Sequence, residues 1–187
     1  KAPSPDSTRS FIGRACAPRS VTLSPRGAML AKLAGIEGTT KGSRAMKWQI
    51  GDVTITKIVE LETTGGSRFI LPDASPEAIR PISWLVPHFA DENGRLKMSI
   101  HALLVEAPGR RIIVDTCLGN DKKDRRVPTW NDRQGRFLQD LSDAGFGRET
   151  IDTVLCTHLH VDHVGWNTKL SNGAWVPTFP NARYLFV

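Results

Sequence analysis

Three of the chain's five histidines lie within six residues, in a segment that reads T-H-L-H-V-D-H-V-G-W. In an extended segment, residues two apart point the same way, so His158 and His160 are able to reach one point. Asp162 and His163 follow where Gly165 permits the chain to turn, and they face a second point close by. Imidazole nitrogen and carboxylate oxygen are the usual ligands of zinc and similar first-row metals. The spacing therefore predicts two adjacent metal ions, each with two ligands from this segment.

The elements expected around this segment alternate between strand and helix patterns. A short apolar run at residues 151–156, I-D-T-V-L-C, predicts a buried strand that ends where the histidines begin. Helical spacing at 130–144 predicts a helix that Asn131 or Asp132 caps and Gly145 ends. Further strands are predicted at residues 48–61, 96–106, 111–115 and 182–187. Strands followed by a helix and a strand are typical of an α/β (α+β) fold.

The basic excess of the chain is confined to its first 45 residues. The net charge is +6, yet residues 46–187 carry 17 basic and 17 acidic residues, which cancel. The body of the protein therefore has no charge excess to attract nucleic acid or anionic lipid. No apolar run approaches the length of a membrane span. We expect a small-molecule substrate, and neither a nucleic-acid nor a membrane partner.

Residues 1–45 differ from the rest in composition. Pro, Ser and Gly are frequent and acidic residues are scarce, which predicts a disordered basic extension or a non-native segment upstream of Met46, with a transit peptide as an alternative. The cysteines Cys16, Cys117 and Cys156 are odd in number and form no C-x-x-C pair. They favour a reducing, cytoplasmic location over a disulfide framework.

A family resemblance rests on the histidine segment and its context. H-L-H-V-D-H matches the H-x-H-x-D-H signature of the metallo-β-lactamase superfamily, and I-I-V-D-T-C-L-G-N resembles the segment that precedes that signature. The match extends over about residues 48–187 and is most similar to the lactonase and organophosphate-hydrolase branch. The resemblance implies a metallo-β-lactamase-type four-layer αβ/βα sandwich, with residues 46–187 as the N-terminal part of that domain.

The chemistry that the resemblance implies is metal-dependent hydrolysis. His158 and His160 would bind metal 1, while Asp162 and His163 would bind metal 2, and a hydroxide held by the ions would attack a small ester, lactone or related substrate. Asp162 would also have a catalytic role, by orienting the water or carrying its proton. Asp115 is either a partner of a ligand histidine's other ring nitrogen or a turn or helix-cap residue. Thr157 has the same kind of role or merely ends its strand.

Several points stay open in the sequence. The cofactors are predicted to be two divalent ions, zinc first, with iron, manganese and cobalt as alternatives. After His163 the chain has no further His, Asp or Glu, whereas the superfamily uses later residues to complete both shells. We therefore expect the remaining ligands beyond Val187 and a domain truncated at its C-terminus. The alternatives are a thioester hydrolase or sulfur dioxygenase of the same superfamily, and a catalytically incompetent metal-binding fragment. The resemblance also suggests a homodimer.

Overall fold

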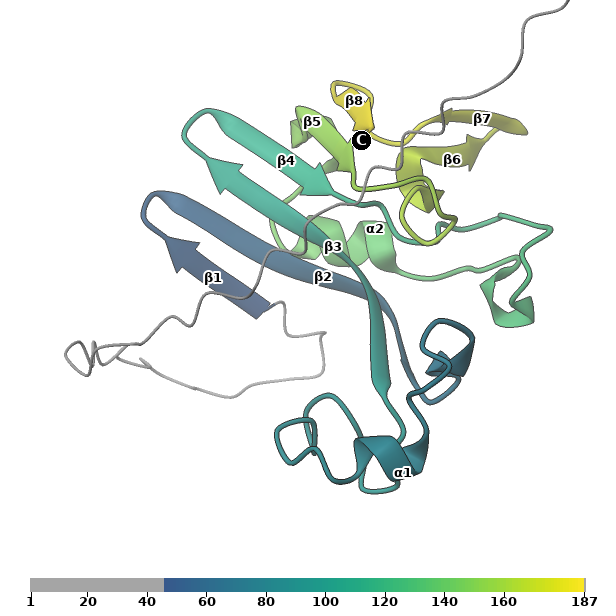
Figure 1. Cartoon of the computed structure of the whole chain (residues 1–187). Helices are drawn as coiled ribbons and strands as arrows, with labels where there is room; N and C mark the ends of the chain where they lie inside the picture. The colour runs from purple at the N-terminus through teal and green to yellow at the C-terminus, as the bar shows by residue number, and fades with distance from the viewer. Residues whose placement is uncertain (1–45, 187) are drawn as a thin grey trace, which may run out of the picture. The chain divides into compact units, whose positions relative to one another are not determined.

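A computed structural model describes residues 46–186 of the chain. The expectations for residues 1–45 lie outside the described part. Six strands form one mixed sheet in the order β1-β2-β3-β4-β5-β8 (Figure 1). They are β1 (Met46–Ile50), β2 (Val53–Thr64), β3 (Lys97–Ala107), β4 (Arg110–Val114), β5 (Thr153–Cys156) and β8 (Arg183–Phe186). The predicted mixed α/β architecture is confirmed.

The direction of the strands decides which loops meet. β1 to β4 are antiparallel neighbours, whereas β4, β5 and β8 run parallel to one another. The carboxyl ends of β4 and β5 therefore lie at the same edge of the sheet. The residues that follow these strands, beginning with Asp115 and Thr157, are neighbours in space although 42 positions separate them.

One face of the sheet is buried beneath α2 (Phe137–Asp143) and the segments around it. Phe137 and Leu141 of this helix are almost fully buried, and Phe137 stacks on Trp166 at 5.9 Å between ring centroids. The sheet contributes fully buried apolar side chains, as alternation on a half-covered sheet requires. These are Ala102, Leu104, Ile113, Val154 and Cys156.

The helix is shorter than its sequence pattern predicts. The spacing predicts a helix over residues 130–144, but α2 begins only at Phe137, after the 3-10 turn η2 (Pro128–Trp130). The cap prediction was wrong. Asn131 directs its side chain to the backbone of Arg125, and the residue at the helix start is Arg136, which makes no capping bond. Gly145 follows the helix with φ of 92°, the left-handed conformation expected of a glycine that ends a helix.

The connection between β2 and β3 contains η1 (Ser67–Phe69) and α1 (Pro76–Ile79) and has a small apolar core of its own. Pro76 begins α1, and Ser75 caps it by accepting a hydrogen bond from the Ala78 N–H at 3.3 Å. Because this connection joins the end of β2 to the start of β3, it leaves the sheet at the same edge as Asp115 and Thr157.

A second, two-stranded sheet follows the histidine segment. The 3-10 turns η3 (Arg148–Thr150) and η4 (Gly165–Asn167) precede β5 and β6, and β6 (Thr168–Ser171) pairs with β7 (Ala174–Pro177) as a hairpin. The hairpin was not predicted, although Asn172-Gly173, both with positive φ, form its turn. Among residues 46–186, no helix is long and apolar enough to cross a bilayer.

Candidate metal centre

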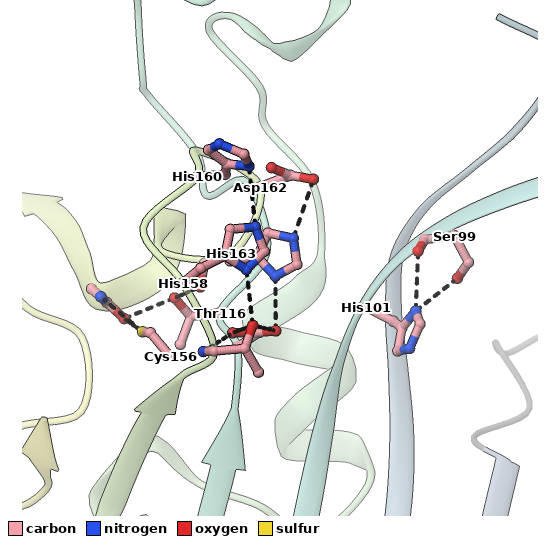
Figure 2. Close-up of polar contacts among 11 residues, drawn as sticks. Ser99, His101, Thr116, Cys156, His158, His160, Asp162 and His163 are labelled. Atoms are coloured by element: carbon pink, nitrogen blue, oxygen red, sulfur yellow. Dashed lines mark hydrogen bonds and ion pairs between the residues drawn. The ribbon is translucent and has the colours of Figure 1, made fainter. Parts of the chain in front are cut away.

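The histidine segment, residues 157–164, forms a largely exposed loop beyond the end of β5, which we term the histidine loop. Figure 2 shows its polar side chains gathered above the ends of β4 and β5. His158 Nε2 and His160 Nδ1 lie 3.1 Å apart. Two nitrogens that bind one tetrahedral zinc at about 2.05 Å would be about 3.3 Å apart. This first pair therefore has the spacing of two ligands of a single ion.

Asp162 and His163 form a second pair. His163 Nε2 lies 3.5 Å from Asp162 Oδ2, again close to the separation of two ligands of one ion. The two pairs are adjacent, because the rings of His158 and His163 have centroids 3.9 Å apart. Over residues 46–186, however, no three His, Cys, Asp or Glu side chains surround one point as metal ligands would. The donor types and the pair spacings are those that metal ions accept, and within residues 46–186 the donors form pairs and not a complete coordination shell.

Asp115 connects the loop after β4 to the histidine loop. Its carboxylate accepts hydrogen bonds from the Thr157 N–H at 2.8 Å and from the Thr157 hydroxyl, and its Oδ2 lies 2.8 Å from His163 Nδ1. A carboxylate only accepts, so Nδ1 carries the proton in a neutral His163 ring, and Nε2, the nitrogen near Asp162, is then the one available to a metal ion. This is the tautomer that a metal ligand requires.

The electrostatics of Asp115 agree with that arrangement. Burial by itself would raise the pKa of this carboxyl, but the hydrogen bonds from His163 and Thr157 outweigh it and hold the pKa below its ordinary value. Asp115 is also held in a left-handed backbone conformation, with φ of 57°. Such a conformation is costly for a residue other than glycine, and Asp tolerates it better than most residues. Thr157 additionally places its hydroxyl 3.1 Å from His158 Nδ1.

The backbone holds the two loops together as well. Thr116 N–H donates to the His163 carbonyl at 2.7 Å, Gly165 N–H donates to Cys117 at 2.7 Å, and Trp166 N–H donates to Thr116 at 2.8 Å. A Cβ at Gly165 would overlap the carbonyl of Leu118, so the close crossing requires glycine at this position. Backbone hydrogen bonds therefore fix the histidine loop against the loop after β4.

Two charged residues near this crossing were not predicted from the sequence. Glu60 of β2 accepts hydrogen bonds from residues of the loop after β4, and Arg125 donates to the Val161 carbonyl within the histidine loop. Neither residue stands in a recognisable motif. Glu60 lies between the apolar residues Val59 and Leu61, where strand alternation allows a polar side chain, so no local signal marked it.

The other histidines and the described cysteines stand apart from the donor pairs. His101 lies on β3, where its ring contacts Ser99 (Figure 2), and His88 is exposed in the connection between β2 and β3. Cys117 and Cys156 are buried free thiols, and burial raises the pKa of both. A raised pKa disfavours the thiolate that metal binding needs, so both thiols act as small buried apolar side chains.

The sequence of residues 97–187 matches the family model of the metallo-beta-lactamase superfamily. Over these residues, just under half of the chain, the sequence is similar to members of this superfamily. The match extends from β3 through the histidine loop to the last residue, and it includes Asp115. A search of the curated proteins finds no match to the chain.

Solved structures of other proteins share the fold of this chain. AidC, a dizinc quorum-quenching lactonase in complex with a product, is 23% identical with a TM-score of 0.55; the alignment covers 75% of this chain and 43% of AidC. The hydrolase AbOPH is 25% identical with a TM-score of 0.52, covering 78% of this chain and 45% of AbOPH. A probable metal-dependent hydrolase from Staphylococcus aureus is 23% identical with a TM-score of 0.52, and the alignment covers 73% of this chain and 47% of that hydrolase. The chain thus spans less than half the length of each of these proteins.

Proposed function

We propose that the protein is a metal-dependent hydrolase of a small ester, lactone or related substrate, and that the histidine loop provides ligands to two metal ions. The observation that carries the proposal is the pairing of donors, 3.1 Å between His158 and His160 and 3.5 Å between Asp162 and His163. The match of residues 97–187 to the superfamily and the likeness to a lactonase and two hydrolases support it.

The proposed roles follow from the contacts. His158 and His160 would hold the first ion, and Asp162 and His163 would hold the second. Asp115 would hold His163 in the tautomer that leaves Nε2 free for the metal, and Thr157 holds Asp115 through its backbone N–H and its hydroxyl. Bound metal ions lower the pKa of water towards neutrality and polarise a carbonyl or phosphoryl oxygen. Asp162, half-buried beside His163, would orient the attacking water or accept a proton during hydrolysis.

Metal titration of paired variants tests the ligand assignment. We expect His158→Ala with His160→Ala to remove one bound cobalt(II) ion and Asp162→Asn with His163→Ala to remove the other, as read from d–d absorption and calorimetry. His101→Ala is the matched control, because its ring lies on β3 away from the loop, and it should leave binding unchanged. Binding that survives both double substitutions would refute the assignment.

Substrate tests separate hydrolysis from the alternatives. With zinc or cobalt, the proposal expects hydrolysis of N-acyl lactones or of aryl esters and phosphotriesters. Turnover confined to thioesters would favour the thioester hydrolase. Oxygen consumption with a persulfide and a single iron ion would favour the dioxygenase. Metal binding without any turnover would leave the chain as a metal-binding protein only.

A further inference from the structure

We propose that Glu60 and Arg125 form a charged clamp on the Leu118 peptide that positions Asp115 and the histidine loop for metal binding. The inference rests on the proposed function, since the groups being positioned are the proposed ligands. Neither residue is proposed to touch metal or substrate. Both act through the two loops that carry the site.

Glu60 reaches the loops because β2 is irregular at this position. Val59 pairs with His101 and Leu61 pairs with Ile100, so Glu60 is the extra residue of a β-bulge and has no partner in β3. A bulge bends its strand and re-aims a side chain.

The Glu60 carboxylate accepts three hydrogen bonds from two separate segments. Oε2 accepts from the Leu118 N–H at 2.6 Å, and Oε1 accepts from the Gly119 N–H at 3.2 Å and from the Trp166 indole N–H at 2.8 Å. Leu118 lies three residues after Asp115, and Trp166 lies three residues after His163. One carboxylate therefore connects the loop after β4 to the turn that closes the histidine loop.

Arg125 holds the same peptide from its other side. Its Nη2 donates to the Leu118 carbonyl at 3.0 Å, and its Nη1 donates to the Val161 carbonyl at 3.1 Å. Val161 stands between His160 and Asp162, so this guanidinium ties the Leu118 peptide to the middle of the donor set. Burial lowers the pKa of Arg125, and the negative charges of Glu60 and Asp162 oppose that effect.

The consequence for the site follows from how tightly the segments cross. Leu118 is fully buried, and its carbonyl lies directly over Gly165 with no space for a Cβ. A displacement of the Leu118 peptide must therefore move Gly165. Because the Thr116 N–H donates to the His163 carbonyl, movement of the loop that contains Leu118 also moves His163, one of the proposed ligands. The opposite charges on the two sides of one peptide restrain that displacement.

Substitutions of equal size separate the clamp from ordinary packing. Glu60→Gln keeps the shape, but its amide nitrogen cannot accept, so at least one of the three N–H donors loses its partner. Glu62→Gln is the control on the same strand, since Glu62 is exposed and its side chain makes no hydrogen bond within the described residues. Arg125→Lys keeps the charge but cannot donate in a fork to both carbonyls.

Two readouts are taken on the full chain. In the metal-free protein, amide and indole hydrogen exchange by NMR reports the Trp166 indole N–H and the Gly165 N–H. The second readout is cobalt(II) titration, which measures the affinity of the two donor pairs for metal. We expect Glu60→Gln and Arg125→Lys each to speed exchange at these sites and to weaken cobalt binding by about tenfold or more, as loss of a supporting contact at a metal site does. Glu62→Gln should change neither. Leu141→Ala, chosen to destabilise α2, should lower the melting temperature without weakening cobalt binding in the folded protein.

The outcomes are distinguishable. Faster exchange with unchanged cobalt affinity in Glu60→Gln would mean that the carboxylate only stabilises the fold, and it would overturn the proposal. Equal losses of affinity in Glu60→Gln and Leu141→Ala would do the same. If the unsubstituted chain binds no cobalt, the proposed function fails, and the clamp is judged on the metal-free protein. There, a shifted His163 Nδ1–H resonance in Glu60→Gln but not in Glu62→Gln supports the clamp, and an unshifted resonance overturns it.

Discussion

Asp115→Asn is the substitution that most directly tests how the loops support the donor pairs. Asparagine has nearly the same size and also tolerates the left-handed backbone that Asp115 adopts. Its carbonyl oxygen can still accept from the Thr157 N–H. Its amide group, however, would face the N–H of His163 Nδ1, so donor would meet donor. The His163 ring must then change tautomer or turn away.

The size of the effect follows from the hydrogen bond that the substitution removes. Hydrogen bonds to charged groups contribute about 1.5–3 kcal/mol each, and Asp115→Asn eliminates the bond from His163 while leaving that from the Thr157 backbone. We expect the free energy of unfolding of the metal-free protein to fall by about 2 kcal/mol. Loss of a partner that holds a ligand histidine weakens metal binding by about 10–100-fold.

Urea unfolding of the metal-free protein and cobalt(II) titration measure the two effects. Asp124→Asn is the matched control, because Asp124 also has a left-handed backbone, with φ of 59°, but is exposed and makes no side-chain hydrogen bond within the described residues. The reasoning would be refuted if Asp115→Asn bound cobalt as tightly as the unsubstituted chain. It would also be refuted if both substitutions reduced stability equally, since the effect would then belong to the backbone and not to His163.

Two further predictions concern the surroundings of the site. Leu141→Ala should lower the free energy of unfolding by about 2–5 kcal/mol, because it leaves a cavity where a fully buried side chain was. Chemical denaturation measures this loss, and a loss below this range would mean that the helix moves to fill the cavity. Burial, with Arg125 nearby, lowers the pKa of Lys122 to about 8 from an ordinary 10.5. Below pH 8 both folded and unfolded chains carry this proton, and between about 8 and 10.5 the unfolded chain binds it more tightly, so stability should rise with pH in that window. Urea unfolding at pH 7.5 and at pH 10 measures this effect on the unsubstituted chain and on Lys122→Met, which lacks the titrating group. Any excess in the free energy of unfolding of Lys122→Met over the unsubstituted chain should be smaller at pH 10 than at pH 7.5. The same excess at both pH values would contradict the shifted pKa.

Local patterns in the sequence were sufficient for the elements around the site. The strands before Asp115 and before the histidine loop are where their apolar runs predicted them, because period-two burial is written into consecutive residues. The start of α2 was not predictable in the same way. Asn131 has the side chain of a helix cap, but the loop at Arg125 engages it instead, and that contact depends on the tertiary structure.

Asp115 and Glu60 show where the prediction stopped. For Asp115 the sequence left two roles open, and only the parallel pairing of β4 with β5 brings it to Thr157 and His163. Glu60 contacts Trp166 across 106 positions because of a bulge that a single sequence does not reveal. No local pattern encodes either contact, since each requires strands that are distant along the chain to be in register first.

The sequence by itself determined which donor groups stand together, three imidazoles and a carboxylate within six residues, and the match to the superfamily includes the same residues. The tertiary structure alone decided how those donors are held. A parallel strand pair places Asp115 against His163, a backbone crossing admits only glycine at position 165, and a bulge directs Glu60 to the Leu118 peptide. The physical reason is range: side-chain chemistry is a property of each residue, whereas orientation and support arise from hydrogen bonds between segments that meet only after the sheet has formed.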